Sequence, residues 1–154
     1  MAPSSEGPHG QLFRIGGPID STVARLRLVG DDLDPDEVTS MLGCRPTEAA
    51  RKGERRPNRS SRPLYARRGI WLLQSAEDEK QPLEAHITAL LDQVTADPEV
   101  WRTLQERFEV DIDVGLFLED DNREFWLSPE VVKALGDRGI GLDVDIYALL
   151  GDDE

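Results

Sequence analysis

The chain has 154 residues, of which 38% are hydrophobic and 32% charged, with a formal net charge of −13. This length allows one domain with its own hydrophobic core, and the acidity disfavours binding to nucleic acid or anionic membranes while it favours basic partners. The single cysteine, Cys44, excludes an intramolecular disulfide framework. Because the chain has no membrane-length apolar run and no signal-peptide core, we expect a cytoplasmic protein of bacterial type, with no membrane partner.

The first residues of the chain predict a flexible arm, and the residues after it predict a folded domain. Residues 1–20 are rich in Gly, Pro and Ser, which is typical of mobile termini. The pattern predicts one domain over residues 21–150, followed by an acidic tail at 151–154. Within the domain, apolar and polar residues alternate over 22–30 as in a half-buried strand, and a near-continuous apolar run over 69–75 predicts a second strand.

Between these strands, an acidic stretch has the signature of a helix start. Asp34 stands at the N-cap position, Pro35 at the first helical position, and Glu37 would complete a capping box. Capping does not explain Asp31 and Asp32, which could hold a cation, but the spacing does not fit a calcium loop. We interpret the stretch as a helix cap, and the sequence predicts no metal site and no cofactor.

The second half of the chain predicts three helices and three strands. The helices are expected at 82–96, 97–108 and 128–139, and the strands at 109–119, 123–128 and 140–150. A turn at 120–122 would join the first two of these strands in a hairpin. In the last strand, the residues expected to face the core are Leu142, Val144, Ile146 and Ala148.

The predicted order is β-α-β-α-α-β-β-α-β. It indicates an α+β two-layer sandwich, in which a mainly antiparallel sheet of about five strands carries helices on one face. The stretches "DPDEVTSMLGCRP" and "SPEVVKALGDRGI" resemble each other. Such an echo would fit two ferredoxin-like split β-α-β halves, although the match is too short to establish a duplication.

A basic loop at residues 51–68 stands out in this acidic chain. Its basic residues are Arg51, Lys52, Arg55, Arg56, Arg59, Arg62, Arg67 and Arg68. One interpretation is a solvated loop that leans on the protein's own acidic surface, and the alternative is a site for a small anion or phosphate. Nucleic acid is disfavoured, because only Tyr65 offers a stacking aromatic among the arginines.

The sequence predicts no catalytic residue. His9 lies in the predicted arm, and His86 borders the apolar stripe of a predicted helix, where packing is the more common role. The chain contains no Gly-x-Ser-x-Gly elbow, phosphate-binding glycine loop or HExxH helix.

Strand alternation brings charged and aromatic side chains to the sheet face away from the helices. The candidate binding residues on this face are Arg25, Arg27, Asp111, Asp113, Asp143, Asp145 and Tyr147, joined by Phe117. Cross-strand ion pairing on a solvated face is one explanation. Two arginines do not balance four aspartates, however, which favours a bound basic partner or ligand.

Four stretches resemble the bacterial domain of unknown function 4279 family: "GDDLDPDEVTSMLGCRPTEAARKGE", "GIWLLQS", "LEAHITALL" and "FWLSPEVVKALGDRGIGLDVDIY". The likeness spans about residues 22–148 and implies a small cytoplasmic α+β domain with no established activity. The family-like positions are Asp32, Leu33, Pro35, Pro46, Gly53, Trp71, His86, Leu127, Ser128, Pro129, Asp143, Asp145 and Tyr147.

These observations predict a non-enzymatic protein-interaction module that binds a basic protein partner, as an immunity or antitoxin-like protein does. One alternative is a small-ligand- or metal-dependent enzyme that uses the aspartate-rich sheet face. The other is anion or phosphate binding by the arginine-rich loop.

Overall fold

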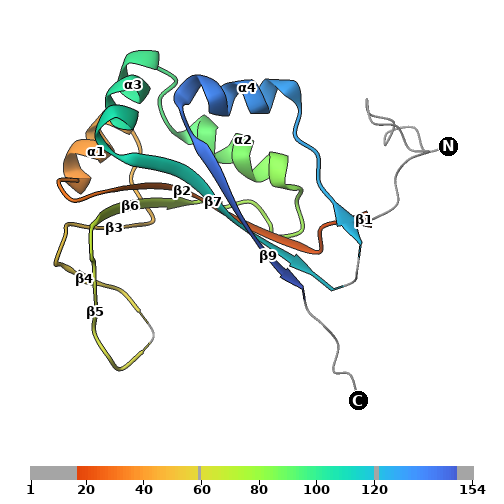
Figure 1. Cartoon of the computed structure of the whole chain (residues 1–154), viewed down its shortest axis with the longest axis horizontal. Helices are drawn as coiled ribbons and strands as arrows, with labels where there is room; N and C mark the ends of the chain where they lie inside the picture. The colour runs from red at the N-terminus through yellow and green to blue at the C-terminus, as the bar shows by residue number, and fades with distance from the viewer. Residues whose placement is uncertain (1–16, 59, 120–121, 149–154) are drawn as a thin grey trace.

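The computed structural model describes residues 17–58, 60–119 and 122–148, and its centre is a five-stranded sheet. In spatial order the strands are β3 (Glu48–Ala50), β6 (Gly69–Gln74), β2 (Ser21–Gly30), β7 (Glu109–Leu118) and β9 (Gly141–Ala148). The helices, which all lie on one side of this sheet (Figure 1), are α1 (Pro35–Leu42), α2 (Leu83–Gln93), α3 (Pro98–Arg107) and α4 (Pro129–Arg138). The predicted α+β two-layer sandwich is confirmed.

The sheet is mixed, which corrects the prediction of a mainly antiparallel one. β2 is antiparallel to both β6 and β7, whereas β9 is parallel to β7. The reason is the connection, because a chain that leaves β7 and returns through the crossover helix α4 re-enters the sheet in the same direction. The ferredoxin-like halves are not formed either, since β7 and β9 are direct neighbours and a split β-α-β unit needs a strand between them.

The predicted hairpin between 109–119 and 123–128 is wrong. Only Arg123–Glu124 forms a strand, β8, and it pairs in parallel with β1 (Gly17–Pro18). The chain has to leave the sheet here to reach the helix layer, where the Ser128 backbone N–H donates to Glu84 of α2 at 2.6 Å. The fifth strand of the main sheet is β3, which is too short to show alternation in the sequence. The predicted turn lies partly outside the described residues, which omit 120–121.

The core lies between the sheet and the helices and follows the predicted alternation of β2. Ala24, Leu26 and Leu28 are completely buried. The Trp71 ring of β6 is also fully buried, and its Nε1–H donates to Thr39 Oγ1 of α1 at 3.1 Å, which fixes this helix on the sheet. A buried large apolar side chain stabilises the fold by about 1.5–3 kcal/mol, so this layer dominates the free energy of folding.

The edge strand β9 departs from the expected burial. Leu142, Ile146 and Ala148 are exposed and only Val144 is partly buried, so the prediction that all four face the core is wrong for three of them. β9 packs mainly against β7, and a side chain on the helix side of an edge strand stays in solvent where the helix layer does not cover it.

The predicted N-terminal arm is folded where the structure describes it. Residues 1–16 lie outside the described part of the chain, as do 149–154 with the predicted acidic tail. Gly17–Pro18 forms β1, and the Asp20 carboxylate accepts a hydrogen bond from the Glu119 backbone N–H at 2.7 Å and one from Arg123 at 3.1 Å. The Glu119 N–H and the Arg123 guanidinium together lower the pKa of Asp20.

The start of α1 matches the cap prediction in part. Asp34 accepts a hydrogen bond from the Asp36 backbone N–H at 3.0 Å, and the helix ends at Gly43, whose φ of 73° favours glycine. The predicted capping box is not formed, because the Glu37 carboxylate accepts two hydrogen bonds from Arg107 of α3, at 2.8 and 3.0 Å. Arg107 lowers the pKa of Glu37 and ties α1 to α3.

No helix in the part of the chain that the structure describes has the length and apolar composition needed to cross a membrane.

We expect Asp34→Ala to lower the free energy of unfolding by about 0.5–2 kcal/mol, because the Asp36 N–H loses its acceptor. Urea denaturation followed by circular dichroism measures the change. Asp34→Asn is the matched control: it keeps the cap acceptor and removes the charge that faces Arg51. Equal losses for both variants would show that the ion pair, and not the cap, is what Asp34 contributes.

Candidate functional site

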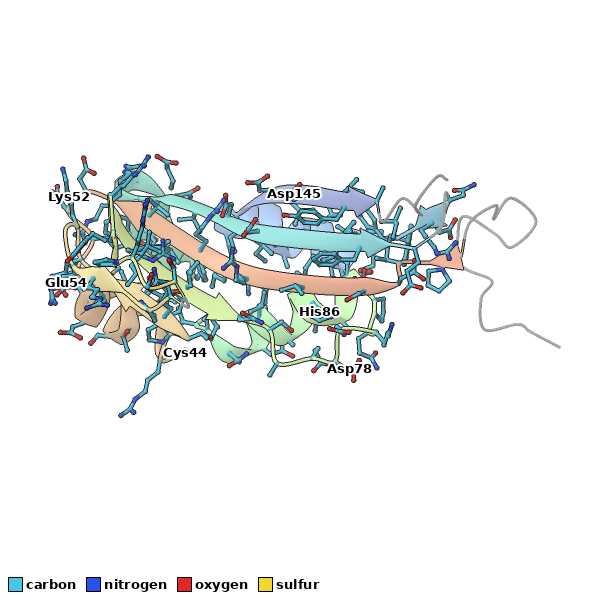
Figure 2. The ribbon with its side chains drawn as sticks, turned by 90° about the horizontal axis from the view of Figure 1, so that it is seen from below. Cys44, Lys52, Glu54, Asp78, His86 and Asp145 are labelled. Carbon is cyan, nitrogen blue, oxygen red and sulfur yellow. The ribbon has the colours of Figure 1, made fainter. Side chains whose placement is uncertain are left out.

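The sheet face opposite the helices, here called the open face, carries the charged residues that the sequence singled out. The register of β2 and β7 sets Arg25 directly opposite Asp113 and Arg27 directly opposite Asp111. Arg25 contacts Asp113 at 2.5 Å, and Arg27 donates two hydrogen bonds to Asp111, at 2.9 and 2.8 Å. These partly buried pairs are cross-strand neighbours, each worth about 0.2–1 kcal/mol. Figure 2 looks onto this side of the sheet.

Arg27 also reaches the edge strand. Its Nη2 lies 3.2 Å from Asp143 Oδ2, and its Nη1 lies 3.9 Å from Asp113 Oδ2. The hydrogen bond to Asp111 and the surrounding carboxylates raise the pKa of Arg27, so the guanidinium stays charged. Arg27 is therefore the cation shared by the aspartates of two strands.

The negative charges of the two β9 carboxylates have fewer cationic partners than those of the β7 carboxylates. Asp143 has a side chain that is 62% exposed and its contact is with Arg27, which Asp111 already engages. Among the described residues, the Asp145 carboxylate forms no ion pair and accepts a hydrogen bond from the Tyr147 hydroxyl at 2.7 Å. The structure thus brings the seven candidate binding residues together, and it leaves the unbalanced negative charge on β9.

An aromatic pair lies beside these carboxylates. Phe117 of β7 and Tyr147 of β9 are in register, and their rings stack with centroids 4.8 Å apart and an interplanar angle of 10°. A hollow of about 370 Å³ opens next to them. Its lining includes Val23, Arg25, Gln74, Asp113, Gly115, Phe117, Asp145 and Tyr147.

The sequence did not point to several residues of this hollow, among them Gly115 and Gln74. Gly115 lies opposite Asp145 in the register and has no side chain to fill the space, and a Cβ there would touch the Phe117 ring at 3.4 Å. Gln74 comes from β6, opposite Arg25. Neither carries a signal in the sequence, because their part in the hollow depends on strand register.

The basic loop folds back on the protein's acidic surface. It contains a small hairpin of β4 (Arg55–Arg56) and β5 (Leu64–Tyr65), which lies on the side of the sheet away from the helices (Figure 1). The closest ion pairs are Arg51–Asp34 at 2.8 Å, Arg56–Glu48 at 2.6 Å and Arg68–Glu109 at 2.6 Å. Asp31, considered as a cation ligand, lies 3.3 Å from Arg68 and 4.0 Å from Lys52.

The remaining basic residues of the loop are less engaged. Arg55, Arg62 and Arg67 make no ion pair within the described ranges, and Arg59 lies outside them. A second hollow of about 380 Å³ lies between the hairpin and the open face, lined by Val29, Arg56, Leu64, Tyr65, Ala66, Arg67, Arg68 and Ile70. Anion or phosphate binding by this loop stays a prediction, with this hollow as the place to look for it.

His86 is buried in the helix layer, as packing predicts, but it also has a polar partner. Its side chain is almost completely inaccessible, and Nδ1 lies 2.9 Å from Ser75 Oγ. Ser75 Oγ also accepts a hydrogen bond from the Glu77 backbone N–H at 3.1 Å. His86 thus ties α2 to the end of β6, away from the open face.

Burial raises the pKa of the Cys44 thiol, which opposes a nucleophilic role for Cys44.

Within residues 17–58, 60–119 and 122–148, no group of three or more His, Cys, Asp or Glu residues is arranged to hold a metal ion.

The fold and the site define an α+β sandwich domain with a charged, partly hollowed sheet face. Residues 20–149 match the family described as "Domain of unknown function (DUF4279)", so the chain belongs to this family. No curated protein and no solved structure matches the chain.

Tyr147 provides a direct test of the open-face geometry. The hydrogen bond to the Asp145 carboxylate, together with its negative charge, raises the pKa of the Tyr147 phenol above the usual value. Asp145→Asn removes the charge and should therefore lower this pKa. The pKa of Tyr147 is measured with and without Asp145→Asn by following ultraviolet absorbance against pH. Both proteins carry Tyr65→Phe, which leaves Tyr147 as the one tyrosine of the chain. An identical titration midpoint in both proteins would contradict the contact.

The alternative of a metal-dependent enzyme has its own test. We expect purified protein to contain no stoichiometric divalent ion, because the aspartates of the open face already face arginines and a tyrosine hydroxyl. We also expect its melting temperature to be the same with and without EDTA. Elemental analysis and thermal unfolding are the measurements. A bound metal, or a melting temperature that falls by several degrees in EDTA, would support the enzyme alternative instead.

Proposed function

We propose that this domain is a protein-interaction module that binds a basic protein partner through the β9 side of its open face. The observation that carries the proposal is the unequal balance of charge across the face. Asp111 and Asp113 face the arginines of β2, whereas Asp145 forms no ion pair within the described residues. In a chain with a formal net charge of −13, these carboxylates attract a cationic surface.

The hollow beside the aromatic pair suits the side chain of a lysine or arginine from the partner. Asp145 lines it and offers carboxylate oxygens without an ion pair among the described residues, whereas Asp113, also in the lining, is paired with Arg25. The stacked rings of Phe117 and Tyr147 form part of its wall. A cation over an aromatic ring gains about 0.5–2 kcal/mol in addition to its ion pairs. Tyr147, beside these carboxylates on the edge strand, also has the size and polarity found in interface hot spots.

The proposed role is neutralisation of a basic protein, in the manner of an immunity or antitoxin-like protein, in the cytoplasm. Such a function needs a stable surface of complementary charge and no catalytic groups. It is consistent with the ion pairs that hold the open face in one arrangement before a partner arrives.

We expect Asp143→Asn/Asp145→Asn to slow association with the partner by on the order of tenfold at low salt, because electrostatic steering accelerates association by 10- to 1,000-fold. Partners are first captured from host cells on the immobilised domain and identified by mass spectrometry. Association rates of the purified pair are then measured by surface plasmon resonance at several salt concentrations. The wild-type rate should fall as salt rises, and the rate for the variant should depend less on salt.

The matched control is Asp92→Asn/Glu106→Gln, which removes the same formal charge from exposed positions on α2 and α3. It should associate at close to the wild-type rate. If both double variants associate equally slowly at low salt, the effect is one of net charge alone. If Asp143→Asn/Asp145→Asn associates at the wild-type rate, the open face is not the binding site.

A further inference from the structure

The outer edge of β9 is a long strand edge that no other strand covers in the described part of the chain. β9 has eight residues and is the last strand of the sheet, paired with β7 alone. Every second N–H and C=O along it therefore points away from the sheet without a strand partner. Its side chains are exposed as well: Ile146 is 60% accessible, Tyr147 45% and Leu142 36%.

The opposite edge of the sheet is protected in a way that β9 is not. β3 has three residues, and Glu48 within it is held by Arg56 of the β4–β5 hairpin at 2.6 Å. Short strands, covering loops, prolines and charged side chains, lysine above all, are common means of blunting an edge. The sequence of β9, GLDVDIYA, contains neither proline nor lysine, and its charged residues are the two aspartates, which oppose an acidic strand but not a basic one. The two edges of this sheet are thus built differently.

The two faces of β9 differ in chemistry. On the helix side, Leu142, Val144 and Ile146 are in register with the buried Ile112, Val114 and Leu116 of β7, so they continue the apolar row of the core into solvent. On the open face, Asp143, Asp145 and Tyr147 alternate with them. A strand added here would meet an apolar row on one face and carboxylates on the other.

We infer that β9 is the docking edge for an extended segment of the partner protein in which basic and apolar residues alternate. The inference rests on the proposed function and names how the basic partner is held. The segment adds a sixth strand to the sheet by main-chain hydrogen bonds to β9. Its lysines or arginines lie over Asp143 and Asp145, and its apolar side chains lie beside Leu142 and Ile146. Directly opposed residues of neighbouring strands lie about 4.5–5.5 Å apart at Cβ, close enough for both kinds of contact.

A second copy of this chain fits the same edge poorly. Symmetric antiparallel pairing about Val144 would set Asp143 of each copy opposite Asp145 of the other, and like charges directly opposite destabilise a sheet. Each copy also brings a formal net charge of −13. The charge on β9 therefore selects a basic strand and opposes self-association.

The test uses the full chain and a capped peptide of alternating Lys and Val, of the same length as β9. Binding is followed by NMR at low salt, and hydrogen exchange of the backbone amides of Gly141–Ala148 is measured with and without peptide. Two comparison peptides share its charge: one has its lysines and valines in two blocks, and one is N-methylated at every amide. We expect the alternating peptide to bind, to protect alternate amides of β9, and to lose at least tenfold in affinity on N-methylation.

The outcomes separate this inference from the function on which it rests. If the N-methylated and block peptides bind as tightly as the parent, and Asp143→Asn/Asp145→Asn weakens all three equally, the strand addition is wrong and charge-driven binding to the open face stands. If no cationic peptide binds and the captured partner is insensitive to the double variant, both proposals fail. If the outward-facing amides of β9, those not paired with β7, are already protected without peptide, the edge is covered by the chain itself or by a second copy, which sedimentation distinguishes, and the inference is overturned.

Discussion

The register between β2 and β7 sets both the buried core and the charged open face. It places Leu26 and Leu28 beneath the helices and at the same time sets Arg27 opposite Asp111. A slip by one residue would move the apolar row into solvent and the guanidinium groups into the core. Burial of each large apolar side chain stabilises the fold by about 1.5–3 kcal/mol, against about 0.2–1 kcal/mol for each cross-strand ion pair. The apolar row thus sets the register, and the ion pairs follow from it.

That register also decides which carboxylates remain available. β7 is the direct neighbour of β2, so its aspartates lie opposite the two arginines, whereas β9 is one strand farther away at a spacing of about 4.8 Å per strand. The long Arg27 side chain spans this distance to Asp143, and Asp145 instead receives the Tyr147 hydroxyl. Unbalanced charge, the aromatic pair and an uncovered strand edge therefore coincide on β9.

The basic loop changes the balance of charge at the other end of the molecule. Arg51, Arg56 and Arg68 pair with Asp34, Glu48 and Glu109, and further arginines of the loop add positive charge. In Figure 2, Lys52 and Glu54 lie at one end of the sheet and Asp145 lies away from them, on β9. The loop thus reduces the negative field at its own end of the protein. For the proposed basic partner, this distribution of charge favours the β9 side.

The features that could be predicted from the sequence are those that depend on a few neighbouring residues. The spans of the three later helices, the Asp34 cap that starts the first one and the alternation that sends Arg25 and Asp113 to the open face are all local, because side-chain direction and capping are set within one turn or two strand positions. The family resemblance also depended on the sequence alone, and the match to residues 20–149 confirmed it.

The folded structure was needed for the features that depend on contacts between distant segments. In the structure, β9 runs parallel to β7 and β3 is the fifth strand of the sheet. The Glu37 carboxylate accepts a hydrogen bond from Arg107, where the sequence predicted a capping box. Ile146 also lies in solvent, although its alternation is that of a core residue. Alternation gives the face on which a side chain lies, but what covers that face depends on where helices far away in the chain come to pack.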